Sequence, residues 1–223
     1  MMLQTIKPDD IFITIPNNYK RFPVDNINEL LFPLKTLPVN VIRCEEDYGP
    51  ICKLLPVLDH INDPDAVIIT IDDDHAYNPG LIENMMAFHR TCPDSALAYA
   101  GWSWNKNNGF DYNLIYPHAR VNYMRAAPIL EGWRGALYKR SFFGDDFKAF
   151  ATSYDEGFLV DDVVISSYLS SKRIDKTVIP TYQNNSNNSL YATPFAPDAL
   201  SQMGTFKELN KKAVEHFQSR GCL

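Results

Sequence analysis

"VIITIDDDHAYNPGLIENMM", residues 67–86, combines a run of branched apolar residues, three consecutive aspartates and a segment with helical spacing. The apolar run over 66–71 is typical of a strand that is covered on both faces. Asn78 and Pro79 offer an N-cap and a first-turn proline for the next helix. The residues expected on the buried side of that helix are Leu81, Ile82, Met85 and Phe88. Adjacent carboxylates repel each other, so the aspartates need a cation or a proton.

Segments on either side of this stretch alternate between strand and helix patterns. Strands are expected over 11–16, 38–43 and 95–102, with helices over 27–35 and 49–61. This order predicts an α/β fold with a mostly parallel, doubly wound sheet flanked by helices. Ligands in such folds bind beyond the carboxyl ends of the strands, where the three aspartates fall.

The second half of the chain has a less regular pattern and is rich in aromatic residues. A helix is expected from about Asp161, a strand over 174–179 and an amphipathic helix over 205–218. We expect one domain over 1–223, with a regular half over about 1–100 and an irregular half over about 101–223.

Composition excludes several classes of function. The chain has 223 residues, 45% of them hydrophobic, and a formal net charge of -6, which argues against a nucleic-acid partner. No apolar run is long enough for a membrane span, and the N-terminal residues lack the apolar core of a signal peptide. The four cysteines form no CxxC pair, which indicates free thiols in a reducing compartment. These features predict a cytoplasmic protein.

Asp72 and Asp74 form a D-x-D pattern directly after the apolar strand. Alternate residues of an extended segment point the same way, so both carboxylates could converge on one ligand while Asp73 faces elsewhere. Oxygen ligands of this kind favour Mn²⁺ or Mg²⁺. The alternative is an acidic loop exposed to water.

Two basic residues lie near a second glycine-containing turn. Arg43 ends the strand over 38–43, and Lys53 lies one turn into the segment that begins at Gly49 and Pro50. Free N–H groups at such a helix start favour an anion, so both side chains could meet phosphates. Ordinary surface charges around a turn are the alternative.

Two later motifs also carry candidate site residues. Gly132 and Gly135 flank Trp133 and Arg134, a pattern that suits close approach of a ligand, stacking on a sugar and contact with phosphate. A bulged strand is the alternative. Further along, Asp161 and Asp162 start the expected helix after an apolar run over 158–160. A carboxylate there could act as a base or bind an acceptor hydroxyl, or both residues could simply stabilise the helix start.

Histidines contribute little to the predicted site. His118 and His216 are isolated, and His75 is expected to point away from Asp74 although it follows that residue directly. All three are interpreted as structural rather than metal-binding.

Together, "IFITIPNN", "DYGPICK", "TIDDD", "EGWRGALY" and "VDDVVISSYL" occur in an order that resembles the metal-dependent glycosyltransferases of the GT-A fold. The similarity covers about residues 11–170. It implies that about residues 1–100 form a nucleotide-binding half and about residues 101–223 an acceptor-binding half. It implies a nucleoside-diphosphate-sugar donor, with UDP-sugar the first choice, a glycan or other hydroxyl acceptor, and Mn²⁺ or Mg²⁺ bridging the diphosphate.

The resemblance also implies roles for individual residues. Asp74 and Asp72 would hold the metal, and Asp162 and Asp161 would lie near the acceptor as the catalytic pair. The residues expected at the donor nucleotide are Thr14, Ile15, Pro16, Arg43, Asp47, Lys53, Asp72, Asp73 and Arg134. A third protein ligand for the metal is not evident, so water or phosphate would complete its coordination.

Two other functions remain open from the sequence. A sugar-nucleotide pyrophosphorylase shares much of this sheet, but it should have a glycine-rich loop after the first strand, where "IPNNYKRFP" has no glycine. A non-catalytic, Ca²⁺-dependent sugar-binding module would bind glycan without nucleotide. The sequence leaves open the donor sugar, the acceptor and whether the anomeric configuration is retained or inverted.

Overall fold

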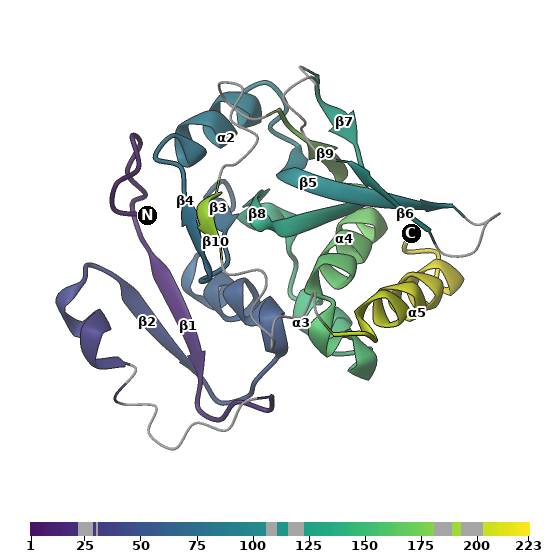
Figure 1. The fold of residues 1–223 in the computed structure, drawn as a ribbon, viewed down its shortest axis with the longest axis horizontal. Helices are drawn as coiled ribbons and strands as arrows, with labels where there is room; N and C mark the ends of the chain where they lie inside the picture. The colour runs from purple at the N-terminus through teal and green to yellow at the C-terminus, as the bar shows by residue number, and fades with distance from the viewer. Residues whose placement is uncertain (22–28, 30, 106–110, 116–122, 181–188, 193–202) are drawn as a thin grey trace.

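The structure is a computed structural model that describes residues 1–21, 29, 31–105, 111–115, 123–180, 189–192 and 203–223. It has an α/β architecture in which helices flank a mixed sheet (Figure 1). This agrees with the predicted fold class at the level of α/β. Among the described residues, no helix has both the length and the apolar character that crossing a bilayer requires.

The main sheet has six strands in the order β3-β8-β5-β9-β7, with β6 paired to β5 outside this path. Their bounds are β3 Val67–Thr70, β5 Ser95–Asn105, β6 Asp111–Ile115, β7 Arg125–Ala126, β8 Ile129–Lys139 and β9 Asp175–Val178.

The prediction of a mostly parallel sheet is wrong for the strand pairs described. Only β5 and β9 run parallel within the main sheet, whereas β3–β8, β5–β8, β5–β6 and β7–β9 are antiparallel. A parallel pair needs a crossover, usually a helix, while an antiparallel pair does not. The described residues between β5 and β8 form strands β6 and β7 and no helix, so β8 returns antiparallel to β5.

Two small sheets accompany the main sheet. The predicted first strands are present as β1 (Phe12–Pro16) and β2 (Asn40–Cys44), which pair in parallel with each other. Their described hydrogen bonds form a separate two-stranded sheet, so they do not extend the main sheet as expected. The short strand β4 (His75–Tyr77) pairs antiparallel with β10 (Ser189–Ala192).

The helix expected over 49–61 is instead two 3-10 helices, η2 (Gly49–Lys53) and η3 (Leu55–His60). Pro56 explains the break, because it lacks an N–H donor and its ring clashes with an earlier carbonyl in a continuous α-helix. Of the helix expected over 27–35, residues 27, 28 and 30 lie outside the described part, and the later residues enter η1 (Phe32–Thr36).

The helix that follows the aspartates is α2 (Leu81–His89). It begins later than predicted, because the Asn78 side chain accepts a hydrogen bond from Gly80 N (2.9 Å) in a turn that precedes the helix. Leu81, Ile82 and Met85 are buried as predicted. The remaining helices are η4 Arg140–Phe142, α3 Phe147–Ala151, η5 Asp155–Leu159, α4 Asp161–Ser171 and α5 Phe206–Ser219.

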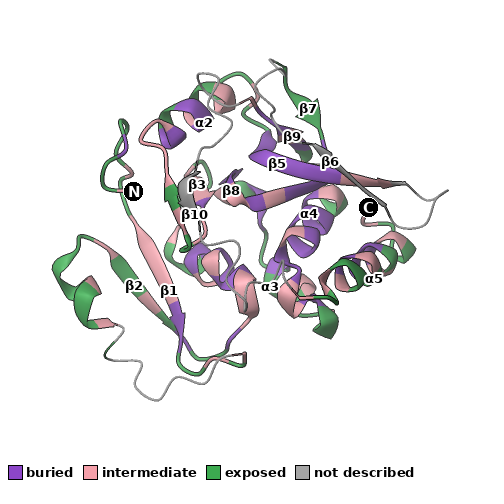
Figure 2. Ribbon diagram, in the orientation of Figure 1, coloured by how far each residue is buried: buried purple, intermediate pink, exposed green. Residues whose placement is uncertain are grey.

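Apolar side chains form two cores, one on each face of the main sheet. Figure 2 shows buried residues along the strands of this sheet and in the helices α2 and α4 beside it. Successive residues of a strand point to opposite faces, so Ala96 and Ala98 of β5 belong to one core and Leu97 and Tyr99 to the other. The larger core includes α4 and α5, and the smaller one includes α2. The sheet is therefore held from both sides, which fixes the strand ends that carry the candidate site.

Candidate functional site

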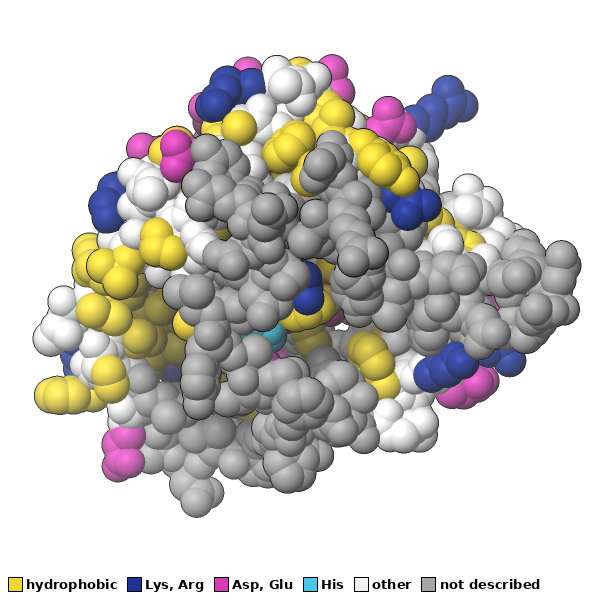
Figure 3. All heavy atoms as spheres, turned by 45° about the horizontal axis from the view of Figure 1, so that its top comes forward, with side chains coloured by type: hydrophobic (Ala, Val, Ile, Leu, Met, Phe, Trp, Pro, Cys, Tyr) yellow, Lys and Arg dark blue, Asp and Glu magenta, His cyan; other side chains and the backbone are white. Residues whose placement is uncertain are grey.

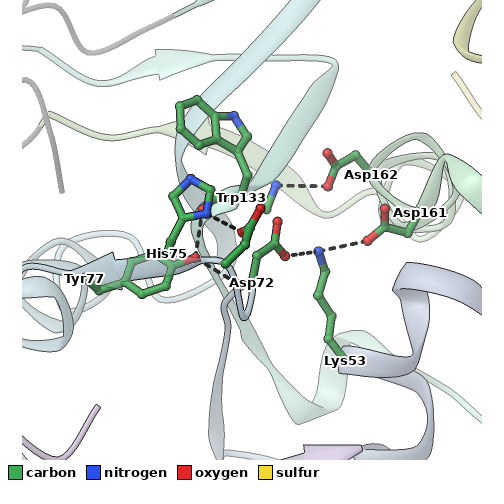
Figure 4. A network of polar contacts seen from close by, with 9 residues as sticks. Lys53, Asp72, His75, Tyr77, Trp133, Asp161 and Asp162 are labelled. Carbon is green, nitrogen blue, oxygen red and sulfur yellow. Dashed lines mark hydrogen bonds and ion pairs between the residues drawn. The ribbon is translucent and has the colours of Figure 1, made fainter. Parts of the chain in front are cut away.

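Charged side chains from three separate segments meet just beyond the end of β3 (Figure 4). Lys53 ends η2, Asp72 follows β3, and Asp161 begins α4. The Nζ atom of Lys53 lies 2.7 Å from Asp72 Oδ1 and 3.1 Å from Asp161 Oδ2. The contact with Asp72 is a hydrogen bond, whereas the contact with Asp161 is an ion pair without hydrogen-bond alignment. One ammonium group therefore joins two of the predicted carboxylate motifs.

Asp162 approaches the same place through a backbone contact. Its Oδ1 accepts a hydrogen bond from Gly132 N at 2.9 Å. A side chain at residue 132 would place Cβ only 3.3 Å from both Asp162 Oδ1 and Lys53 Nζ. Glycine therefore lets strand β8 lie against the charged cluster.

The segment Gly132–Gly135 is a bulge in β8. Ala136 pairs with Ala98, but Glu131 pairs with Ala100, so four residues of β8 lie opposite one residue of β5. Gly135 has a φ of +101°, a conformation that other residues rarely adopt. The bulged strand that the sequence left open is present, and Trp133 and Arg134 lie within the bulge.

Aromatic and basic groups surround the bulge. The guanidinium of Arg134 lies 4.3 Å from the centre of the Trp133 ring, and the His75 ring lies 5.5 Å from it. Trp133 Nε1 donates to Glu131 Oε2 at 2.9 Å. Three side chains of the protein itself, Arg134, His75 and Glu131, thus contact the indole that the sequence suggested for stacking on a sugar. Figure 3 shows a histidine close to basic and acidic side chains on this face of the molecule.

Tyr77 ties the aspartate segment to the bulge. Its hydroxyl accepts a hydrogen bond from Asp72 N and donates one to Trp133 O, both at 2.8 Å. Burial raises the pKa of Tyr77 above the usual value, so the hydroxyl stays protonated and can donate. The positions of Asp72 and Trp133 therefore depend on each other.

His75 contradicts its predicted orientation. Its Nδ1 atom makes a short contact with Asp74 Oδ1, and its side chain is only 4% exposed. The prediction assumed an extended segment, but residues 73 and 74 form a turn before β4, so the alternation of side chains does not apply. The same turn removes the geometric basis for expecting Asp72 and Asp74 to point the same way.

The charge balance of the cluster is negative. Burial disfavours the charged form of Lys53, yet Asp161, Asp72 and Asp162 outweigh it and hold the pKa of Lys53 well above its usual value. Burial and the neighbouring Asp161 raise the pKa of Asp162 well above its usual value. Three carboxyl groups around one ammonium therefore favour a bound proton or a further cation.

The aspartates have the chemistry for a hard divalent cation. The contact described for the Asp72 side chain uses Oδ1 only, and the side chains of Asp72 and Asp74 are 29% and 42% exposed. Carboxylate oxygens that solvent can reach suit Mn²⁺ or Mg²⁺. Within the part of the chain that is described, no group of three or more His, Cys, Asp or Glu residues is arranged to hold a metal. A metal here would need further ligands from water or substrate.

Most of the other predicted donor residues lie around the β1–β2 sheet. Thr14, Ile15 and Pro16 form the end of β1, where Ile15 pairs with Arg43 of β2. Arg43 donates from two nitrogens to Asn17 Oδ1, at 3.1 and 2.7 Å. None of these four residues has a described contact with the Lys53 cluster.

Asp47 and Asp73 also lie apart from that cluster in their described contacts. Asp47 is buried, and its carboxylate accepts hydrogen bonds from Lys20 N and Gly49 N, both at 2.8 Å. It thus joins the loop after β1 to the start of η2, a structural role that its sequence context did not reveal. Asp73 is exposed at the turn before β4.

Two further groups were missed by the sequence reasoning. Glu131 lies next to Gly132, and burial raises the pKa of its carboxyl above the usual value. Tyr138 is buried, and burial together with Asp162 raises the pKa of its hydroxyl. Glu131 was visible as an acidic residue at the start of the Gly-Trp-Arg-Gly motif, whereas Tyr138 had no local signal.

Two other histidines were singled out from the sequence, His118 and His216. His118 lies outside the described residues. His216 stacks on Tyr154 with ring centres 4.4 Å apart, a packing contact that agrees with the structural interpretation. No protein-family model matches the chain, and no curated protein matches its sequence.

Proposed function

We propose that the protein transfers a sugar from a nucleoside-diphosphate-sugar, with UDP-sugar the first choice, to a hydroxyl acceptor such as a glycan. One observation carries the proposal: the segment of the D-x-D pattern and the Asp161–Asp162 pair lie at one place, linked by Lys53. In metal-dependent glycosyl transfer a cation stabilises the leaving diphosphate, and in the inverting reaction a carboxylate takes the proton of the acceptor hydroxyl. The sequence resemblance to GT-A glycosyltransferases supports the same reading.

Asp72 and Asp74 are the residues that would hold Mn²⁺ or Mg²⁺. When bound, such an ion stabilises the negative charge that develops on the leaving nucleoside diphosphate. Arg134 is the basic side chain that we assign to the donor phosphates, since it lies against Trp133, whose carbonyl is linked through Tyr77 to the Asp72 segment, and a guanidinium binds phosphate well.

Asp162 is the residue that we assign to the acceptor. Gly132 N–H holds one of its oxygens, and Lys53 pairs with its neighbour Asp161. In an inverting reaction, the Asp162 carboxylate takes the proton of the acceptor hydroxyl while that oxygen attacks the anomeric carbon. In a retaining reaction, the same pair positions the acceptor instead.

Calorimetry with UDP, in the presence and absence of Mn²⁺, tests the proposal. The wild-type protein is expected to bind UDP more tightly with Mn²⁺, and Asp74→Ala is expected to lose this gain because one metal ligand is removed. The matched control is Asp65→Ala, whose side chain is 80% exposed and pairs with Lys139 away from the cluster. Equal Mn²⁺-dependent affinity in wild type and Asp74→Ala would remove the metal assignment.

A further inference from the structure

Lys53 contacts both halves of the candidate site. Its ammonium lies 2.7 Å from the donor-side Asp72 and 3.1 Å from the acceptor-side Asp161, and its side chain is only 19% exposed. Asp162 lies close to the same group, because both approach the space that a side chain at Gly132 would fill. A single positive charge is thus shared between carboxylates that we assign to different substrates.

The carboxylates therefore compete for the single ammonium group of Lys53. A divalent ion that binds Asp72 neutralises that carboxylate and weakens its attraction for Lys53. The ammonium sits on a flexible four-carbon stem and can move toward Asp161 without a change of the backbone. Since the side chains of Lys53 and Asp161 are only 19% and 9% exposed, such a change is screened less than at an exposed site.

We infer that Lys53 is a positioning residue that couples cation binding at Asp72 to the Asp161–Asp162 pair. The inference rests on the proposed function and adds an order of events to it. When a cation is bound to Asp72, the Lys53 ammonium pairs with Asp161, and the Asp162 carboxylate is available to accept a hydrogen bond from the acceptor hydroxyl. Coupling of this kind is reciprocal, so a change at Asp161 must alter the affinity for the cation.

A double-mutant cycle with Mn²⁺ alone tests the coupling. Binding is measured by electron paramagnetic resonance of free Mn²⁺ for wild type, Lys53→Met, Asp161→Asn and the double variant. Lys53→Met is expected to bind Mn²⁺ about fivefold more tightly or better, because the competing ammonium is gone. Asp161→Asn is expected to bind Mn²⁺ more weakly, because the Lys53 ammonium then pairs with Asp72 alone and competes with the metal ion there. In the Lys53→Met background, this effect of Asp161→Asn should largely disappear.

The outcomes separate the inference from the proposed function. An equal effect of Asp161→Asn with and without Lys53 would mean that Asp161 acts directly through space, which overturns the coupling and leaves the proposed function intact. No Mn²⁺ binding by the wild-type protein would overturn both. Lys172→Met and Asp146→Asn are the matched controls, since they form an exposed ion pair of 2.7 Å elsewhere and should leave Mn²⁺ affinity unchanged.

A measurement on the wild-type protein covers the case in which Lys53→Met does not fold. Mg²⁺ is titrated while carboxyl carbon resonances of the aspartates are followed by nuclear magnetic resonance. The Asp161 resonance is expected to shift as Mg²⁺ saturates Asp72, because Lys53 moves onto Asp161. The resonance of Asp146 should stay constant. A shift of Asp72 without any shift of Asp161 would overturn the coupling.

Discussion

Asp161 and Asp162 are neighbours in the sequence but differ in their contacts. Asp161 forms an ion pair with Lys53, whereas Asp162 receives a backbone N–H from Gly132. Adjacent residues at the start of a helix point about 100° apart, so the two carboxyls meet different surroundings. Burial and Asp161 raise the pKa of Asp162, which suits a group that must accept a proton during a reaction.

Asp162→Asn is expected to lower the rate of sugar transfer and to raise the stability of the fold. Transfer should fall by about 10²-fold or more, the usual effect of removing a general base, while Mn²⁺-dependent UDP binding persists. Stability should rise near pH 7, because the native site favours the neutral form of Asp162. Sugar transfer assays and urea unfolding at several pH values measure both effects.

The pH dependence of that stability has a definite sign. The ordinary pKa of the group is 3.8, and the native pKa is raised well above it. As pH rises between these values, the unfolded chain loses a proton that the native protein keeps, so wild type loses stability. Asparagine does not titrate, so the advantage of Asp162→Asn should grow with pH above about 4 and vanish below it. Asp65→Asn is the exposed control, and no gain is expected there. A wild-type rate of sugar transfer in Asp162→Asn would contradict its assignment to the acceptor and would mean that Asp162 only stabilises the start of α4.

At the scale of single elements, the bulge in β8 determines where the site lies. Four residues of β8, among them Trp133 and Arg134, lie opposite one residue of β5, while Glu131 and Ala136 stay paired with β5. Gly135 makes this possible with a φ of +101°. A Cβ there would lie 3.3 Å from Leu81 and Met85 of α2, so the bulge also packs closely on that helix.

Gly135→Ala is expected to destabilise the protein by about 1–3 kcal/mol, the cost of holding a non-glycine residue at such a φ. Urea unfolding measures this loss, and weaker Mn²⁺-dependent UDP binding should accompany it because Arg134 moves. Gly204→Ala is the matched control, since a Cβ at Gly204 meets nothing within 4 Å. Equal stability of both variants would show that the bulge tolerates a side chain.

Elements with strong local signals were predicted well, and their pairing was not. The strand over 66–71 and the helix after it were found because apolar spacing and turn residues are local properties. Pairing depends on contacts between distant segments, so nothing local indicated that β8 would lie between β3 and β5. The candidate site shows the same division. Asp72 and Asp161 stood out as acidic motifs, but the Tyr77 bridge between the aspartate segment and the bulge arises from the folded chain.

At the scale of the whole molecule, the sheet separates two cores that have no buried residue in common among those the structure describes. Phe217 of α5 is fully buried in one core and stacks on Phe150 with ring centres 5.2 Å apart. Met85 of α2 is fully buried in the other core. Substitutions at the two positions should therefore act independently.

Phe217→Ala is expected to cost about 3–5 kcal/mol and Met85→Ala about 2–5 kcal/mol, because each leaves a cavity. The double variant should lose the sum of the two within about 0.5 kcal/mol, as distant sites usually do. Urea unfolding of all three proteins, compared with wild type, measures these differences. A larger deviation from the sum would show that the sheet transmits strain from one core to the other.

The double hydrogen bond of Asp47 bears on how the length of this chain can vary. By joining Lys20 N to the start of η2, the Asp47 carboxylate closes a loop across a separation of 27 residues. The entropy of closing a flexible loop changes slowly with its length, so doubling the loop costs only about 0.6 kcal/mol. Insertions between β1 and β2 would therefore add little to the entropy cost of forming the Asp47 hydrogen bonds. The ends of β1 and β2 can stay in place while the connection between these strands becomes longer or shorter.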